Sequence, residues 1–231
     1  MPVLECSGLG KRFGSVDALA DVSIRIEPGR IAGLLGPNGS GKTTLIKLAT
    51  GLLTPTAGQL TVCGSTPGTA ASAQVSYLPD RNCLPLWMTA RQLTDFYADF
   101  YADFRREAAE DMLARLNIPG KQRIRTMSKG AREKVQLIMV MSRAAQLYLL
   151  DEPIGGVDPA TRDYILSTII GSYNPQASVL ISTHLIADVE RILDDVIFLD
   201  RGHVVLQASA EQIRREKRMS VDQLFREVFR C

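Results

Sequence analysis

Short apolar segments alternate with longer helical stretches along most of the chain. Alternation of this kind is typical of a mostly parallel sheet with helices on its faces. Two turn clusters, at 27–29 and 200–203, predict antiparallel neighbours and so a small antiparallel sheet beside the main one. Eight segments have the length and composition of strands: 22–26, 31–35, 59–62, 75–78, 147–150, 179–182, 196–199 and 204–206.

Residues 89 to about 145 break this alternation, and their pattern predicts a wholly helical block. Thr89 and Gln92 have the spacing of a capping box at its start. An aromatic stripe follows, with residues at every fourth position: Phe96, Phe100 and Phe104, beside Tyr97 and Tyr101. Such a stripe favours core packing, and the alternative is a docking surface for another protein. We interpret the block, about 82–145, as an insertion between two halves of one core.

Composition narrows the class of protein. The chain has 231 residues, 45% of them hydrophobic, which is enough for a substantial core. No apolar run reaches the ~18–20 residues of a membrane span, and the N-terminus at 1–5 has no basic region followed by an apolar stretch, so we expect a soluble, non-secreted chain. A net charge of +2 is too small to indicate nucleic acid as a partner. The cysteines lack metal-ligand spacing and are expected to be free thiols in a reducing compartment: Cys6, Cys63, Cys83 and Cys231.

A glycine-rich motif directly follows the apolar segment 31–35. It matches the phosphate-binding pattern G-x-x-x-x-G-K-[ST] and is followed by helix-forming residues: Gly36, Pro37, Asn38, Gly39, Ser40, Gly41, Lys42 and Thr43, then Thr44. Its glycines allow backbone N–H groups to surround an anion, Lys42 adds a full charge, and Thr43 offers a hydroxyl to Mg²⁺. The motif predicts a nucleoside triphosphate site; the alternative is a chance glycine-rich turn.

A second motif ends the apolar segment 147–150. Asp151 and Glu152 follow it directly, and ionised carboxylates at the end of a buried strand require a cation or a ligand. Beside a phosphate loop, Asp151 is expected to hold Mg²⁺ through its water shell. Glu152 is expected to orient or deprotonate the attacking water. The alternative is a solvated strand end.

Together these motifs resemble those of the nucleotide-binding subunits of ABC transporters, over about residues 3–210. The resemblance implies an α/β P-loop NTPase core with a small antiparallel β subdomain and the inserted helical subdomain. It divides the chain into an ATP-binding domain, 1–212, and a helical tail, 213–231. It further implies ATP and Mg²⁺ as cofactors, a second ATP-binding subunit (homodimer or heterodimer), a transmembrane permease on another chain, and a cytoplasmic position on the inner membrane face.

The resemblance also assigns roles to individual positions. Phe13 matches an aromatic that stacks on adenine, unless it is a plain strand-end residue. Thr43 and Asp151 match the magnesium positions, and Glu152 the catalytic base. Asp158 lies in the segment that resembles the loop crossing the dimer interface, although it can also cap a helix before Pro159. His184 resembles the switch histidine that contacts the γ-phosphate, whereas His203 is expected in a solvated hairpin turn.

Two motifs depart from the family pattern. The signature Leu-Ser-Gly-Gly-Gln is here Met-Ser-Lys-Gly-Ala at 127–131. Ser128 and Gly130 are kept and are implied to contact the γ-phosphate of the partner subunit, and Lys129 adds a charge that indicates an altered site rather than a dead one. Asp80 stands where glutamine is usual. It can reach Mg²⁺ through water, unless it is an ordinary turn aspartate.

The sequence therefore predicts an ATP-hydrolysing subunit that drives a separate permease through ATP-dependent dimerisation. The segment 120–126 lacks the acidic stretch of fused multidrug exporters and favours families with a separate permease, often exporters. Two alternatives stay open: a non-transport ABC ATPase of the assembly type, and a regulatory nucleotide binder with slow turnover.

Overall fold

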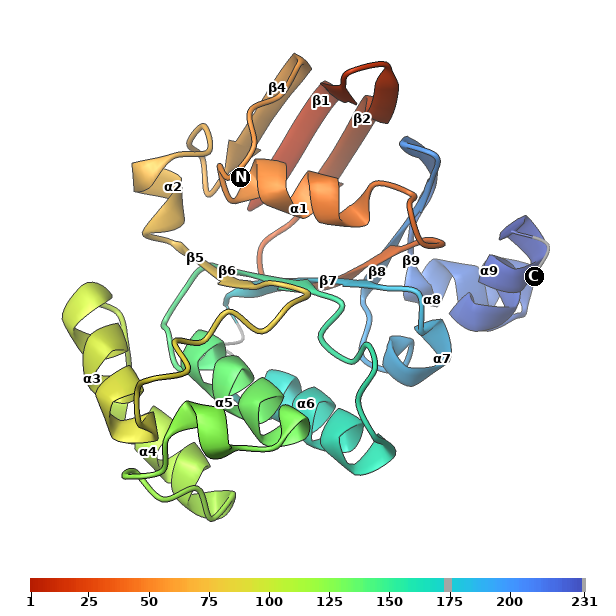
Figure 1. Ribbon diagram of the computed structural model, residues 1–231. Helices are drawn as coiled ribbons and strands as arrows, with labels where there is room; N and C mark the ends of the chain where they lie inside the picture. The colour runs from red at the N-terminus through yellow and green to blue at the C-terminus, as the bar shows by residue number, and fades with distance from the viewer. Residues whose placement is uncertain (173–175, 230–231) are drawn as a thin grey trace.

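The computed structural model describes residues 1–172 and 176–229 and contains two sheets (Figure 1). The larger sheet has the strand order β5-β6-β7-β3-β8-β9, parallel except for β9, and the smaller one is antiparallel with the order β2-β1-β4. The strands are β1 (Leu4–Phe13), β2 (Val16–Ile26), β3 (Ile31–Leu35), β4 (Ala57–Val62), β5 (Val75–Leu78), β6 (Leu147–Asp151), β7 (Ser178–Thr183), β8 (Asp195–Asp200) and β9 (His203–Ser209).

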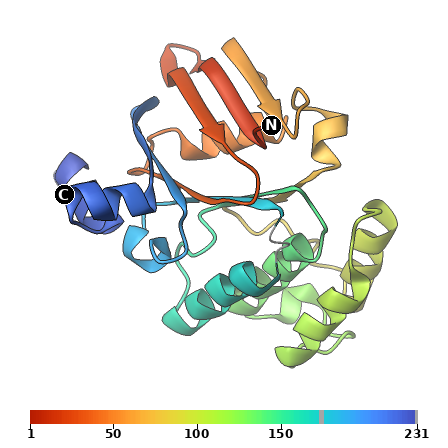
Figure 2. The ribbon, with the colours of Figure 1, turned by 180° about the vertical axis from the view of Figure 1, so that it is seen from behind.

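The helices cover both faces of the larger sheet (Figures 1 and 2). Helix α1 lies between the two sheets, and α5 and α6 lie on the opposite face, with α3 and α4 beyond α5. The helices are α1 (Lys42–Ala49), α2 (Thr69–Ser72), α3 (Ala90–Phe100), α4 (Arg106–Arg115), α5 (Lys129–Met141), α6 (Pro159–Ser172), α7 (Ile186–Val189), α8 (Ala210–Gln212) and α9 (Val221–Phe229), with short turns at Ile124–Thr126 and Ile213–Lys217. None of those in the described ranges is long and apolar enough to cross a bilayer.

The predicted α/β class is confirmed, and each of the eight predicted strand segments lies within an observed strand. Strand β1 was missed. Its pairing with β2 shifts register between Cys6 and Leu9 and again between Leu9 and Lys11. These bulges, together with Gly8 and Gly10, interrupt the alternation that identifies a strand.

The two predicted antiparallel turns have different outcomes. The turn at 27–29 does not join antiparallel neighbours, because β2 and β3 belong to different sheets. All five residues of β3 are buried, so this strand needs cover on both faces and lies inside the larger sheet. The turn at 200–203 does join β8 and β9, but this pair closes one edge of the larger sheet instead of extending the small one.

The inserted block is not helical throughout. Loops separate α3, α4 and α5, and the capping box of Thr89 and Gln92 begins α3 as predicted. Helix α3 ends at Phe100, and the aromatic stripe divides. Tyr97 and Phe104 pack against the apolar cluster inside the block, whereas Phe96 is 46% and Phe100 68% exposed. A four-residue spacing drifts around a helix of 3.6 residues per turn, so a single helix face cannot bury every member.

The C-terminal helix packs on the larger sheet. Residues 221–229, within the predicted helical tail, form a helix, and the rings of Phe225 and Phe229 lie 5.5 and 5.9 Å from that of Phe198 in β8. Cys231, one of the predicted free thiols, lies outside the described residues. The end of α9 thus lies beside β8, which neighbours β3, the strand that leads into the phosphate-binding motif.

Candidate active site

The glycine-rich motif forms the connection from β3 to α1. Gly39 and Gly41 have φ angles of 80° and 110°, and a Cβ on Gly36 would lie 2.2 Å from the carbonyl oxygen of Leu199. All three positions therefore require glycine. The N-cap of α1 is Gly41, and within the described residues no side chain caps this helix. The loop borders a cavity of about 290 Å³ lined by Ala18, residues 38–44, Asp80 and Glu152.

Lys42 lies across this loop. It is 5% exposed, and its Nζ donates hydrogen bonds to the carbonyl oxygens of Gly36 (2.8 Å) and Pro37 (3.0 Å). Burial lowers the pKa of Lys42, and the nearby Glu152 carboxylate, 3.6 Å away, opposes that shift. The loop also buries the hydroxyl of Ser40, which has no hydrogen-bond partner among the described residues. The loop thus holds two side-chain donors: Nζ of Lys42 bonds to carbonyl oxygens, and the Ser40 hydroxyl has no acceptor among the described residues.

Asp151 ends β6 and is fully buried. Its Oδ1 accepts hydrogen bonds from the hydroxyls of Ser182 (2.5 Å) and Thr43 (3.1 Å), and burial raises its pKa. Its Oδ2 is buried and has no partner within the described ranges. A carboxylate oxygen without a partner beside a threonine hydroxyl is a donor set that suits a hard divalent cation.

Glu152 is held by the next strand and contacts the predicted histidine. Its backbone has a φ of 49°, and its N–H donates to the carbonyl oxygen (3.0 Å) and the hydroxyl (3.1 Å) of Ser182 in β7. Its two carboxylate oxygens lie 3.2 and 3.1 Å from Nδ1 of His184, which directly follows β7. Because β3, β7 and β6 are neighbours in the parallel sheet, their carboxyl ends bring Lys42, Glu152 and His184 together.

Asp80 and Phe13 lie at the border of this arrangement. Asp80 follows β5 and lines the loop cavity. Its side chain is exposed, and its Oδ2 lies 4.0 Å from Nε of Arg81. Phe13 ends β1, is 47% exposed, and has Nζ of Lys11 5.0 Å from its ring centroid. Phe13 does not line the loop cavity itself. The aspartate therefore joins the cluster, and the aromatic ring lies outside it.

Ser128, Gly130 and Asp158 form a separate group away from the loop cavity. Ser128 caps α5 by accepting from the N–H of Ala131 (3.2 Å). Asp158 accepts from the N–H (3.0 Å) and hydroxyl (2.7 Å) of Thr161, so its predicted capping role at α6 is present. A Cβ on Gly130 would lie 3.8 Å from the Asp158 carboxylate. The chain places these three residues together, but not with Lys42.

Lys129 lies between Ser128 and Gly130 of this second group and is the first residue of α5. Its Nζ donates to the carbonyl oxygen of Gly156 (3.3 Å) and lies 3.8 Å from the Glu133 carboxylate. The contact joins the start of α5 to the segment that continues from Glu152. The side chain is 71% exposed, so solvent weakens both interactions.

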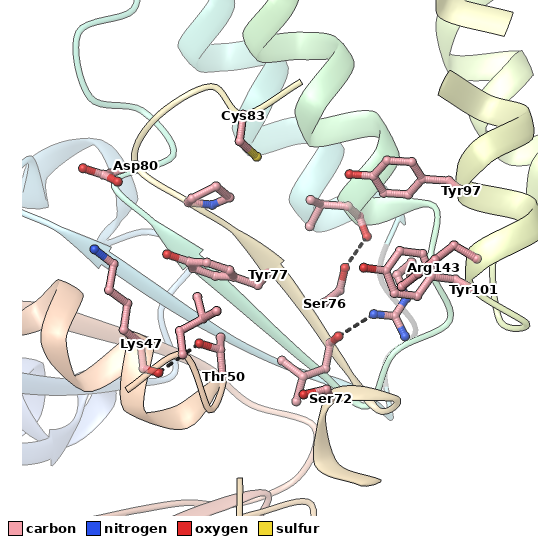
Figure 3. Close-up of a pocket in the computed structure, with 15 residues that line it drawn as sticks. Lys47, Thr50, Ser72, Ser76, Tyr77, Asp80, Cys83, Tyr97, Tyr101 and Arg143 are labelled. Atoms are coloured by element: carbon pink, nitrogen blue, oxygen red, sulfur yellow. Dashed lines mark hydrogen bonds between the residues drawn. The ribbon is translucent and has the colours of Figure 1, made fainter. Parts of the chain in front are cut away.

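A groove of about 590 Å³ was not predicted from the sequence (Figure 3). It lies between the core and the inserted block, and its walls include Lys47, Tyr77, Tyr97, Phe100 and Arg143. Asp80 and Cys83 lie on the segment that borders it (Figure 3). The aromatic stripe was the sequence feature that could have indicated the groove, because Tyr97 and Phe100 of the stripe line it. The alternative interpretation of the stripe as a docking surface points to this region.

Arg143, which lines the groove, contacts both the inserted block and the larger sheet. It is 4% exposed, pairs with Asp103 (3.0 and 3.1 Å), donates to the carbonyl oxygens of Ala73 and Val75, and stacks 4.0 Å from the ring of Tyr101. These contacts tie the inserted block to the edge of the larger sheet.

Comparison with known proteins identifies the family. The profile described as ABC transporter matches residues 19–155. The ABC transporter ATP-binding protein YhaQ of Bacillus subtilis is 30% identical over 89% of this chain and 70% of its own length. The Nod factor export ATP-binding protein I of Ralstonia nicotianae is 30% identical over 92% of this chain and 68% of its own. A solved ATP-binding subunit of an ABC transporter superimposes with a TM-score of 0.88 at 27% identity, covering 98% of this chain and 99% of its own. The chain therefore belongs to the ABC transporter family, as an ATP-binding subunit with ATPase activity.

Proposed function

We propose that this subunit powers a separate membrane permease of the exporter type by ATP-dependent dimerisation, with Glu152 as the base for hydrolysis. The observation that carries the assignment of residues is the convergence of Lys42, Glu152 and His184 at the carboxyl ends of three neighbouring strands. Export is favoured by the similarity to a protein named for Nod factor export. The permease would hold the subunit at the inner face of the membrane.

The triphosphate enters the cavity beside the phosphate loop. The glycine-rich loop offers backbone N–H groups at Asn38, Gly39 and Gly41, and the start of α1 offers more. Lys42 leaves the carbonyl oxygens of Gly36 and Pro37 and transfers its hydrogen bonds to phosphate oxygens, which as anions are the stronger acceptors. Phe13, exposed at the end of β1, stacks on the adenine.

Thr43 and Asp151 suit Mg²⁺, because Asp151 Oδ2 is buried and has no partner in the part of the chain that the structure describes, and the hydroxyl of Thr43 adjoins this carboxylate. Asp80 borders the same cavity and would act through water. When bound, the ion would neutralise charge on the phosphate oxygens. Glu152 then orients a water and accepts its proton, and His184, whose Nδ1 contacts the Glu152 carboxylate, steadies the γ-phosphate.

The second group of residues serves a partner subunit. Ser128, Gly130 and Asp158 lie away from the chain's own phosphate loop, so they can meet a triphosphate only from another copy or a related subunit. Hydrolysis removes the bridging γ-phosphate and allows the dimer to open. The exposed Phe96 and Phe100 and the adjoining groove offer the permease a surface on the inserted block.

The test of the catalytic assignment is Glu152→Gln. The amide cannot accept the proton of water, so we expect kcat to fall by about 10²-fold or more while ATP still binds. Size-exclusion chromatography with ATP should then show a trapped dimer. Glu107→Gln on the exposed part of α4 is the matched control and should keep normal turnover. Normal turnover by Glu152→Gln would remove Glu152 from this role.

The test of the transport assignment is the partner. Purification of the tagged chain from detergent-solubilised membranes should recover a polytopic membrane protein in stoichiometric amount. Recovery of a soluble assembly partner in its place would favour the non-transport alternative.

A further inference from the structure

Gln136 is a buried polar residue to which the proposed mechanism gives no role. It lies in the second half of α5 and is 4% exposed. Its Oε1 accepts a hydrogen bond from the backbone N–H of Cys83 (3.1 Å), and its Nε2 donates to the backbone carbonyl of Arg81 (3.4 Å). One amide thus satisfies a donor and an acceptor two residues apart on a single segment. A side chain of glutamine's length with both kinds of group is needed for that arrangement.

The segment held by Gln136 begins at Asp80, which separates two cavities. Asp80 lines the cavity of the phosphate loop and also the groove beside the inserted block. Cys83 lies further along the same segment and also lines the groove (Figure 3). Any displacement of Asp80 toward a bound nucleotide therefore pulls on the backbone that Gln136 contacts.

The other end of the connection is the start of α5. Gln136 lies eight positions after Ser128, or ~12 Å along the helix at 1.5 Å per residue. A second bond reinforces the pairing, because the hydroxyl of Ser76 in β5 donates to the carbonyl oxygen of Val140 (2.8 Å). The strand β5, the segment after it and α5 are thus bonded at two places, and a helix transmits displacement along its axis with little bending.

We propose that Gln136 is a positioning residue that makes Asp80–Cys83 and α5 move as one body. A shift of Asp80 in the chain's own nucleotide site then reaches Ser128 and Gly130, the residues proposed to serve the nucleotide of the partner subunit. The proposal deepens the proposed function and rests on it for the roles of Asp80 and Ser128. Its structural part, the clamp itself, stands without any nucleotide.

The test uses Gln136→Met in the full chain and the exposed thiol of Cys83 as the reporter. Methionine has a similar length and no amide, so it fills the space while leaving the N–H of Cys83 and the carbonyl of Arg81 unpaired. We expect thiol modification at Cys83, assigned by peptide mass spectrometry, to become about tenfold faster without nucleotide. Gln146→Leu, at an exposed glutamine outside α5, is the control and should leave the rate unchanged.

Nucleotide supplies the second measurement. In the unmodified chain, ATP with Mg²⁺ should change the Cys83 rate, and in Gln136→Met that response should be lost. Turnover should fall by about tenfold in kcat with KM nearly unchanged, because binding is intact and the link between the sites is broken. Gln136→Glu keeps the acceptor for the Cys83 N–H and should give intermediate values.

Two outcomes overturn the proposal. An unchanged Cys83 rate in nucleotide-free Gln136→Met would show that the amide does not hold the segment. A faster rate with unaltered kcat would show that the clamp is only structural. Absence of ATP turnover in the unmodified chain would contradict the proposed function instead. The circular dichroism spectrum and Tm of each variant establish that it is folded.

Discussion

Helices α1 and α5 both begin at a lysine, directly after Gly41 and Ser128 respectively, yet the two starts differ in the exposure of that lysine and in their capping. The side chain of Lys42 is 6% exposed and that of Lys129 is 71% exposed. Helix α1 follows Gly41 and has no side-chain cap, whereas Ser128 caps α5. We call the buried start of α1, with Lys42 and the glycine-rich loop, the closed site, and the exposed start of α5, with Ser128 and Lys129, the open site. The same residue type at the same helical position is buried in one and exposed in the other.

The comparison shows how a loop is prepared for a ligand. An uncapped start leaves backbone N–H groups for an anion to bind, and the enclosing loop lowers the local dielectric, so that each contact counts for more. The start of α5 is capped and exposed, so it lacks both advantages. The first site is thus built within one chain, and under the proposed function the second is completed by a partner subunit.

The largest difference should appear in nucleotide affinity. Lys42→Met removes a buried charge that would pair with phosphate, and we expect ATP to bind about 100-fold more weakly to the isolated chain, a loss of ~2.7 kcal/mol. Titration with a fluorescent ATP analogue measures this. Lys129→Met should alter the same affinity by less than about twofold, since solvent screens the exposed charge. Equal losses in the two variants would refute the contrast.

Backbone strain should give the next largest difference between the two helix starts. Gly41→Ala places a Cβ at a φ of 110° and 2.6 Å from the carbonyl oxygen of Ala18, and we expect the free energy of unfolding to fall by about 2 kcal/mol. At Gly130 the nearest atom to a new Cβ is 3.4 Å away. Gly130→Ala should therefore stay within about 0.5 kcal/mol of the original in urea unfolding. A comparable loss at Gly130 would mean that both helix starts are equally tight.

The buried carboxylate of the closed site should give a pH signature. Burial raises the pKa of Asp151. At a pH above that raised pKa, the buried ionised carboxylate lowers the free energy of unfolding. This loss of stability is absent at a pH below the ordinary pKa of about 3.9. Asp151→Asn should raise Tm by a few degrees at pH 7 in the absence of metal. The gain should shrink as the pH falls toward 4. A gain that is constant with pH would assign the effect to packing.

The smallest change concerns the cap of the open site. Ser128→Ala removes the hydrogen bond to the N–H of Ala131 and should cost about 1 kcal/mol of unfolding free energy. Ser128→Asp keeps a capping oxygen and should restore most of it. If alanine and aspartate behave alike, the cap contributes nothing to α5.

The sequence predicted the closed site more fully than the open one, for physical reasons. Continuous apolar strands such as β6 and β7 are recognisable locally. Asp151 ends β6, and Glu152 and His184 directly follow β6 and β7. Parallel pairing then brings strand ends together without further information. Bulged β1 lacked such a pattern, and the turn at 27–29 was misread because sheet membership depends on distant partners.

The groove and the clamp could not be predicted, because each joins elements that are distant in sequence. Gln136 lies 53 residues from Cys83 in the sequence. A single polar residue among apolar helix positions does not indicate which residue it will bond to. The fate of the aromatic stripe likewise depended on where α3 ends. Such contacts require the packing of α5 against β5 to be known first.

The backbone at Glu152 carries a consequence for engineering. A residue with a Cβ at a φ of 49° sits in a conformation that glycine or asparagine tolerates better, so replacing Glu152 by either should relieve strain. Selection of random variants for heat resistance alone would then enrich chains that have lost this carboxylate. Any search for a hardier form of the subunit must screen for turnover at every round.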